Sequence, residues 1–149
     1  MEPVALCCPD THRVRTRSRG VGGRCLYVAM DILRTTIVVD TADLDAESTF
    51  WAAMYGGTVE KDRDWHDVRV DGRTVLGIQL APNHVRPQWP GGDQQQQLHL
   101  DLHVDDIAAA DIEARRLGAQ LVQGADLAAS SGFVVYTDPA GHPFCLCWD

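Results

Sequence analysis

Residues 98–106 carry the most regular pattern in the chain, a strict alternation of apolar and polar side chains. The apolar positions are all aliphatic: Leu98, Leu100, Leu102 and Val104. An alternation with a period of two predicts a strand that packs on one face and is open on the other. The open face holds two imidazoles and a carboxylate: His99, Asp101 and His103.

The rest of the pattern predicts two helices and further strands. The segment 44–55 has one broad apolar stripe and ends at Gly56-Gly57, which is typical of a helix closed by glycine. Asp71-Gly72 between two alternating runs is a strong hairpin signal. We expect helices at 44–55 and 107–117, and strands at 32–39, 58–60, 65–70, 73–80, 98–104, 120–122, 132–137 and 144–148.

The order of these elements repeats. Val39-Asp40 recurs as Val104-Asp105, and the helix-ending Gly56 recurs as Gly118. A nearly constant offset with matching element order indicates an internal duplication. We therefore predict an α+β protein of two βαβββ modules, residues 31–81 and 98–149, packed as one unit. Residues 82–97, rich in Pro, Gly and Gln, are expected to be a linker.

Charge and cysteine usage limit the partners. The net charge is −8, so the protein as a whole is not built to bind nucleic acid. Residues 1–30 contain five arginines, and we interpret this stretch as a basic extension that is poorly ordered. No apolar run suits a membrane span, and the five cysteines favour free thiols in a reducing cytoplasm. We expect a cytoplasmic protein whose partner is a small molecule.

Three local patterns carry a family resemblance. The first is the strand ending in Val-Asp before a capped helix, seen twice. The second is Phe50-Trp51-Ala52-Ala53-Met54-Tyr55-Gly56, and the third is the turn Asp138-Pro139-Ala140-Gly141-His142-Pro143-Phe144. Together they resemble the vicinal oxygen chelate superfamily, the glyoxalase-like and bleomycin-resistance-like fold, over residues 32–149. This fold hosts lyases, isomerases, dioxygenases and drug-binding proteins, so it does not define a reaction.

The resemblance implies a cup of mixed sheet with the helices outside, and often a homodimer. It also implies that metal ligands come from the first and last strand of each module. Those positions hold Arg34, Gln79, His99 and Cys145. Because a guanidinium cannot ligate a cation, we favour a site with no metal or other cofactor. If a metal is bound, the ligands are His99, Gln79 and Cys145, and the ion is Zn, Fe, Ni or Mn.

Three functions stay open. The first is acid–base chemistry on a small carbonyl or anionic molecule, of lyase, isomerase or cyclase type, with His99, Asp101 and His103 as the catalytic residues. The second is binding without turnover, as in antibiotic binding or self-resistance. The third is a metal-dependent lyase or dioxygenase. The expected ligand-binding residues in the cup are Arg34, Thr36, Gln79, Trp65, Phe133 and Cys145.

Overall fold

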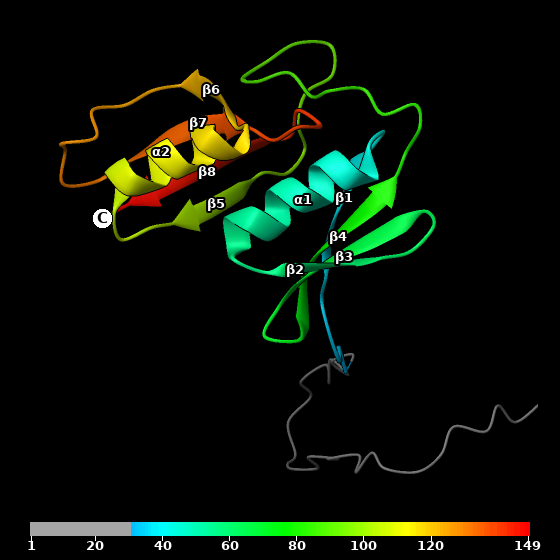
Figure 1. The fold of residues 1–149 in the computed structure, drawn as a ribbon. Helices are drawn as coiled ribbons and strands as arrows, with labels where there is room; N and C mark the ends of the chain where they lie inside the picture. The colour runs from blue at the N-terminus through cyan, green and yellow to red at the C-terminus, as the bar shows by residue number, and fades with distance from the viewer. Residues whose placement is uncertain (1–30) are drawn as a thin grey trace, which may run out of the picture. The chain divides into compact units, whose positions relative to one another are not determined.

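The computed structural model describes residues 31–149, of which 34–149 form one compact unit. The basic extension predicted for residues 1–30 lies outside the described residues. The described chain runs strand, helix, three strands, and then repeats that order (Figure 1). The elements are β1 (Ile37–Thr41), α1 (Leu44–Tyr55), β2 (Thr58–Lys61), β3 (Trp65–Val70), β4 (Arg73–Leu80), β5 (Leu100–His103), α2 (Ile107–Leu117), β6 (Gln120–Gln123), β7 (Gly132–Thr137) and β8 (Pro143–Trp148).

The two modules form two sheets of the same design. The strand order is β1-β4-β3-β2 in the first sheet and β5-β8-β7-β6 in the second. In each sheet the first strand pairs parallel with the last, and the other pairs are antiparallel. The duplication and the α+β class predicted from the sequence are therefore confirmed.

Two strand predictions were too long. The first strand begins at Ile37 rather than at residue 32, so Arg34 and Thr36 precede it. The middle strand is limited to Leu100–His103, because it pairs with β8 from Phe144 onward. The residue before that pairing is Pro143, which has no N–H to donate to a ladder.

Local sequence signals explain where the helices begin and end. Asp43 accepts a hydrogen bond from the Ala46 N–H at 3.0 Å, and Asp106 accepts one from Ala109 at the same distance. Gly56 and Gly118 end the two helices with φ of 64° and 110°. These left-handed conformations favour glycine, and both helices span the predicted residues.

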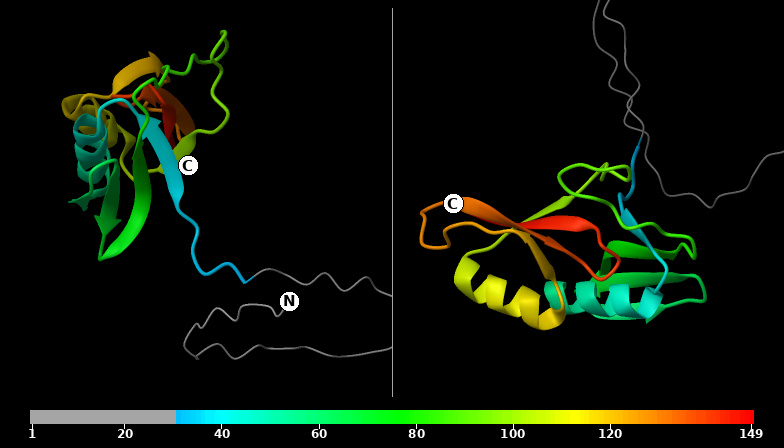
Figure 2. Two further views of the ribbon diagram at one scale, coloured as in Figure 1. Left: turned by 90° about the vertical axis from the view of Figure 1, so that its right-hand side faces the viewer. Right: turned by 90° about the horizontal axis from the view of Figure 1, so that it is seen from above.

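Both helices lie on one side of the sheets, and the segment 82–97 crosses the other side (Figure 2). The faces turned toward the helices form the core, which includes Trp51, Leu76, Ile78, Phe144 and Leu146. The alternate positions face the other side, where Gln79, Asp101 and His103 are exposed. The predicted register of the strands is therefore confirmed, because a slip by one residue would exchange these faces.

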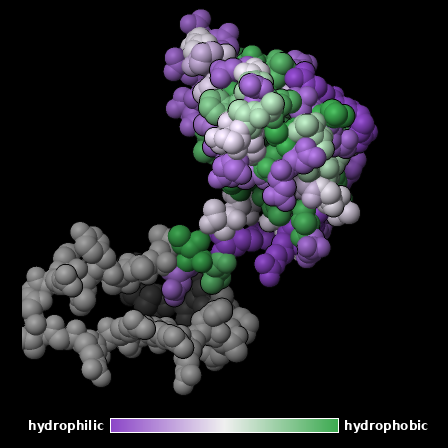
Figure 3. Space-filling model, turned by 90° about the vertical axis from the view of Figure 1, so that its left-hand side faces the viewer, coloured by the Kyte–Doolittle hydropathy of each residue, from purple (hydrophilic) through white to green (hydrophobic). Residues whose placement is uncertain are grey.

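On the face drawn in Figure 3, hydrophobic residues are interspersed among hydrophilic ones. Among residues 31–149, no helix is both long and apolar enough to cross a membrane.

Candidate functional site

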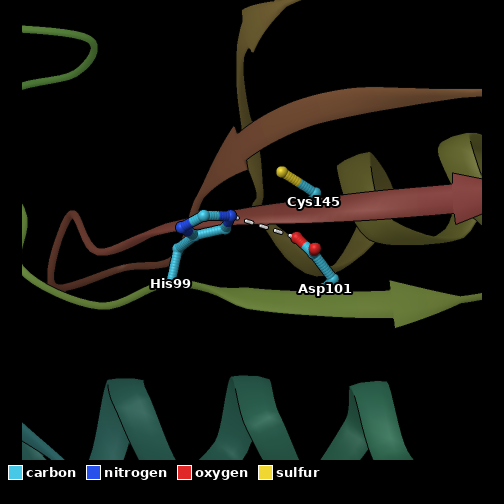
Figure 4. Close-up of side chains that lie close together, drawn as sticks. All are labelled: His99, Asp101 and Cys145. Carbon is cyan, nitrogen blue, oxygen red and sulfur yellow. Dashed lines mark ion pairs between the residues drawn. The ribbon is translucent and has the colours of Figure 1, made fainter.

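Three side chains that could take part in catalysis or metal binding meet on the open face of the second sheet. Asp101 on β5 is the register partner of Cys145 on β8, and His99 lies two residues before Asp101. The His99 Nε2 is 3.2 Å from the Asp101 Oδ1. Figure 4 shows all three side chains on the side of the strands that is turned away from α1. Parallel pairing of β5 with β8 thus brings together groups that are far apart in the chain.

The second ring nitrogen of His99 is also engaged. The side-chain amide of Gln96 lies 3.2 Å from the His99 Nδ1. If Nε2 donates to Asp101, then Nδ1 carries the lone pair and accepts from Gln96. His99 therefore becomes a free base at Nδ1 only when the Gln96 amide moves aside.

Cys145 is held as a neutral thiol. Burial and the neighbouring Asp101 carboxylate raise its pKa to about 12. Burial and the same carboxylate also raise the pKa of Cys147. Because the thiolate is the reactive form, neither residue is a nucleophile at neutral pH.

The same three residues fit a metal ion. One ligand atom from each of His99, Asp101 and Cys145 lies within 4.8 Å of the others. An imidazole, a carboxylate and a thiol form a donor set that suits zinc or iron. This set shares two members with the metal ligands predicted from the sequence and has Asp101 in place of Gln79.

A cavity of about 570 Å³ lies between the two modules beside this group. Its walls include Gln79 from β4 of the first module and His99 from the start of the second. Apolar residues of β1 line one wall, and residues of the turn before β8 line another: Ile37, Val38, Val39, Asp138, His142 and Pro143. This volume suits a small organic molecule.

The segment 82–97 is more than a connection, because part of it covers the open face. The Trp89 ring lies 6.0 Å from the His99 ring, centroid to centroid. Trp89 and Gln96 enclose a small void together with Val135 and Cys145. Among residues 31–149, the Trp89 Nε1 and the Gln96 Oε1 are buried with no hydrogen-bond partner. The segment thus packs tightly over His99 and Cys145 and partly shields them from solvent.

The structure brings only some of the predicted site residues together. Gln79 and His99 line the cavity, and Asp101 and Cys145 lie against His99. His103 lies further along β5 and lines a second hollow near α2. The remaining predicted residues are not among those that line the large cavity.

Those remaining residues have their own environments. Arg34 is exposed before β1, and Thr36 is half-buried there. Trp65 lies across Gly77 on the open face of the first sheet, and its Nε1 donates to Asp67 at 3.1 Å. Phe133 is 47% exposed on β7. Their roles in ligand binding stay predictions.

Sequence reasoning missed a buried group at another wall of the cavity. The Trp51 Nε1 donates to Glu47 at 2.8 Å and to Asp138 at 3.2 Å. The Nδ1 of His142 lies 3.0 Å from Asp138 and 3.8 Å from Glu47. One signal was present in the sequence: Glu47 is a charged residue one helical turn before Trp51, on the stripe that faces the core.

The electrostatics of this group are unusual. Burial raises the pKa of Glu47 to about 7. Burial also disfavours charge on His142, but its hydrogen bonds to Asp138 and Glu47 outweigh that effect and raise its pKa to about 9. Burial by itself would raise the pKa of Asp138, but the hydrogen bonds with His142 and Glu47 outweigh it, so the pKa is lowered overall. An ionised Asp138 beside a protonated His142 follows from these directions.

The sequence profile of the glyoxalase-like domain family matches residues 36–147. Together with the two βαβββ modules, this match defines a protein of the vicinal oxygen chelate superfamily. The chain therefore belongs to the glyoxalase-like domain family. No curated protein matches the sequence.

Solved structures share this fold at low sequence identity. The fosfomycin resistance protein FosX from Mesorhizobium loti has a TM-score of 0.59 at 10% identity, covering 81% of this chain and 94% of that chain. A glyoxalase-related enzyme from Fulvimarina pelagi has a TM-score of 0.56 at 21% identity, covering 78% and 89%. A glyoxalase/bleomycin resistance protein/dioxygenase family enzyme from Burkholderia phytofirmans has a TM-score of 0.58 at 16% identity, covering 76% and 95%. At these identities the likeness shows the fold alone.

Proposed function

We propose that this protein is a small-molecule enzyme that moves a proton next to a carbonyl or acidic group of its substrate, as in isomerase, lyase or cyclase chemistry. The substrate lies in the cavity between the two modules. His99 is the base, acting through Nδ1, and Asp101 orients the imidazole by accepting from Nε2. The observation that carries this proposal is the 3.2 Å contact of His99 with Asp101 at the wall of a 570 Å³ cavity.

One further feature supports a small polar substrate. Gln96 and His99 both line the cavity. A polar molecule bound there competes with the Gln96 amide for the His99 Nδ1, and its binding therefore frees the base.

The test is exchange of carbon-bound hydrogen with deuterated water, followed by proton NMR. Dihydroxyacetone and pyruvate serve as probes because their C–H groups lie next to a carbonyl. We expect wild-type protein to accelerate exchange of at least one probe, and the His99→Gln variant to lose about 100-fold or more of that rate. His103→Gln is measured beside it, because His103 lies on the same strand and lines a second hollow near α2. A loss in His99→Gln alone assigns the base to His99, and a loss in both assigns a role to His103 as well. Exchange no faster than in buffer, for either probe, contradicts the proposal.

A second candidate function is metal-dependent catalysis at the same place. It is favoured by the close approach of His99, Asp101 and Cys145, whose ligand atoms lie within 4.8 Å of one another. A metal there would act as a Lewis acid on the substrate oxygen. Elemental analysis of purified protein tests this candidate: about one zinc, iron, nickel or manganese per chain that is lost in Cys145→Ser supports it. A metal-free protein that catalyses exchange contradicts it.

Binding without turnover is the alternative to both. The structural neighbour FosX is a fosfomycin resistance protein, and an antibiotic-like ligand is a candidate occupant of the cavity in this chain. Retained affinity with no product from any bound compound would favour this alternative. Arg34, Thr36, Trp65 and Phe133 stay proposed ligand contacts, each to be tested by an alanine variant in the same binding assay.

We further propose that the protein is a cytoplasmic homodimer. Cys145 and Cys147 are free cysteines, which agrees with a reducing compartment. Light scattering after size exclusion gives the oligomeric state directly, and a monomeric mass over a range of concentrations contradicts the dimer.

A further inference from the structure

His142 occupies a prepared position at the cavity. Its Nδ1 is held 3.0 Å from the buried Asp138 carboxylate, with Glu47 behind it at 3.8 Å. Its ring is packed against that of His84 at a centroid distance of 4.9 Å. The side chain is 20% exposed, and it lines the large cavity together with His84 and His99. The orientation of the imidazole is therefore fixed from three sides.

Each oxygen of the two carboxylates beneath His142, those of Asp138 and Glu47, accepts at least one hydrogen bond. Trp51 donates to both, and the Glu47 Oε2 accepts from the Ala140 N–H at 2.9 Å. The Asp138 Oδ1 accepts from the N–H groups of Gly141 and His142 at 2.8 and 2.7 Å. These bonds hold the turn closed and fix the position of both carboxylates.

Closing the turn does not require the imidazole. The backbone hydrogen bonds of the turn go to Asp138 and Glu47, not to the His142 ring. Glu47 also places a second carboxyl group within 4 Å of the His142 ring. Among residues 31–149, no hydrogen bond engages the Nε2 of His142, the ring nitrogen opposite the one that Asp138 holds.

We infer that His142 is a catalytic acid of the cavity, which donates the proton on Nε2 to a substrate oxygen that gains negative charge, with Asp138 and Glu47 as positioning residues. This role rests on the proposed function. The base removes the C–H proton, the electron pair of that bond shifts to the carbonyl oxygen, and this oxygen takes the proton from Nε2. Solvent then restores the proton to the neutral imidazole.

Two observations agree with a donor rather than a second base. The raised pKa of His142 keeps the ring protonated at neutral pH. The base of the proposed function, His99, lies at a different part of the wall of the same cavity. The titratable groups that face His142 are Asp138, Glu47 and His84, and the Arg86 side chain lies close by over Gly141.

The first test is deuterium exchange with the probe that wild-type protein accepts. His142→Asn keeps a side-chain donor for Asp138 but has no Nε2. We expect kcat to fall by about 100-fold with KM little changed, as for removal of a donor to a developing oxyanion. Glu47→Gln removes the second carboxyl group, and its circular dichroism is compared with that of wild type because the amide NH2 would face one of the two N–H groups that Glu47 accepts from. The loss of activity at high pH should begin at a lower pH in this variant than in wild type. Wild-type kinetics in His142→Asn, with exchange intact, overturn the inference.

The second test needs no turnover. Oxalate is used as the probe because it is a planar dianion with the shape of an enediolate. In protein labelled with nitrogen-15 at histidine, we expect oxalate to shift the Nε2 resonance of His142 and to leave Nδ1 nearly unchanged, and His142→Asn to weaken oxalate binding by about tenfold or more. No shift at the His142 Nε2 overturns the inference. If wild-type protein exchanges no probe but oxalate still binds Nε2, the proposed function fails while the donor site stands.

Discussion

Asp101 and Cys145 are register partners on β5 and β8, and the carboxylate of one raises the pKa of the thiol of the other. This relationship makes the thiol unreactive in the protein without metal. The reactivity of the Cys145 thiol therefore reports on the arrangement of His99, Asp101 and Cys145.

We predict slow alkylation of Cys145. At pH 7.5 iodoacetamide should modify it at least about tenfold more slowly than a cysteine in a short peptide, because the thiolate is scarce. Asp101→Asn removes one cause of the raised pKa, although burial remains, so the rate should increase. Mass spectrometry of the peptide that contains Cys145 gives both rates. A rate equal to that of the peptide would show that the thiol is not held in this way.

The buried pair Glu47 and His142 predicts how stability depends on pH. Both pKa values are raised in the folded protein, from 4.5 to about 7 for Glu47 and from 6.5 to about 9 for His142. A group whose pKa is raised by folding stabilises the folded protein fully at pH values below its pKa in the unfolded chain. This stabilisation is lost as the pH rises through its pKa in the folded protein. The unfolding free energy from urea titration should therefore fall between pH 5 and pH 9, with about 1.4 kcal/mol for each unit of raised pKa as the upper limit.

Two variants separate the contributions to this dependence of the unfolding free energy on pH. His142→Asn should flatten it between pH 7 and 9. Glu47→Gln should flatten it between pH 5 and 7 and should also move the His142 contribution to lower pH, because Glu47 helps to raise the pKa of His142. An unchanged slope in both variants would place its origin elsewhere in the molecule.

The indole N–H of Trp51 predicts a stability cost larger than that of lost volume. It donates to two buried carboxylates, so Trp51→Phe leaves both with one donor fewer. We expect the variant to lose about 2–4 kcal/mol of unfolding free energy, from the unpaired acceptors and the smaller ring. Phe50→Leu is the matched control, since it removes aromatic volume next to Trp51 and no hydrogen bond. Equal losses in the two variants would mean that the hydrogen bonds contribute nothing.

Gly77 gives a test of the open face of the first sheet. A Cβ at this position would lie 2.4 Å from the Cζ2 of Trp65, so Gly77→Ala forces the indole to move. We expect a loss of about 1–3 kcal/mol and a change in tryptophan fluorescence. Gly124→Ala is the control, because its nearest neighbour would be 3.9 Å away. Unchanged fluorescence in Gly77→Ala would show that Trp65 does not cover this position.

The alternation of apolar and polar residues was enough to predict which face of each strand is buried and which is open. Burial alternates along a strand, so the exposed Asp101 and the buried Leu146 follow from residue order. The bounds of the helices followed equally well, because Asp43 and Gly56 fix them through local hydrogen bonds and φ. Strand ends depend on a partner strand, and for that reason the start of β1 was misplaced and Arg34 with it.

The candidate site was less accessible from the sequence. Trp89 and Gln96 cover His99 because the segment 82–97 folds back over the sheet, and composition alone gives no sign of that path. The role of His142 depends on Glu47, which is 95 residues earlier in the chain. No local pattern joins two such positions, and only the packing of α1 against the turn before β8 brings them together.

The repeated strand order has a consequence for how such a cavity changes over time. In a pocket made by two identical subunits, every substitution appears on both walls at once. Here each wall is encoded separately, so one keeps an amide and aliphatic residues at Gln79 and Val38 while the other gathers imidazoles at His99 and His142. Tandem fusion thus lets a single gene place unlike chemistries on opposite sides of one substrate.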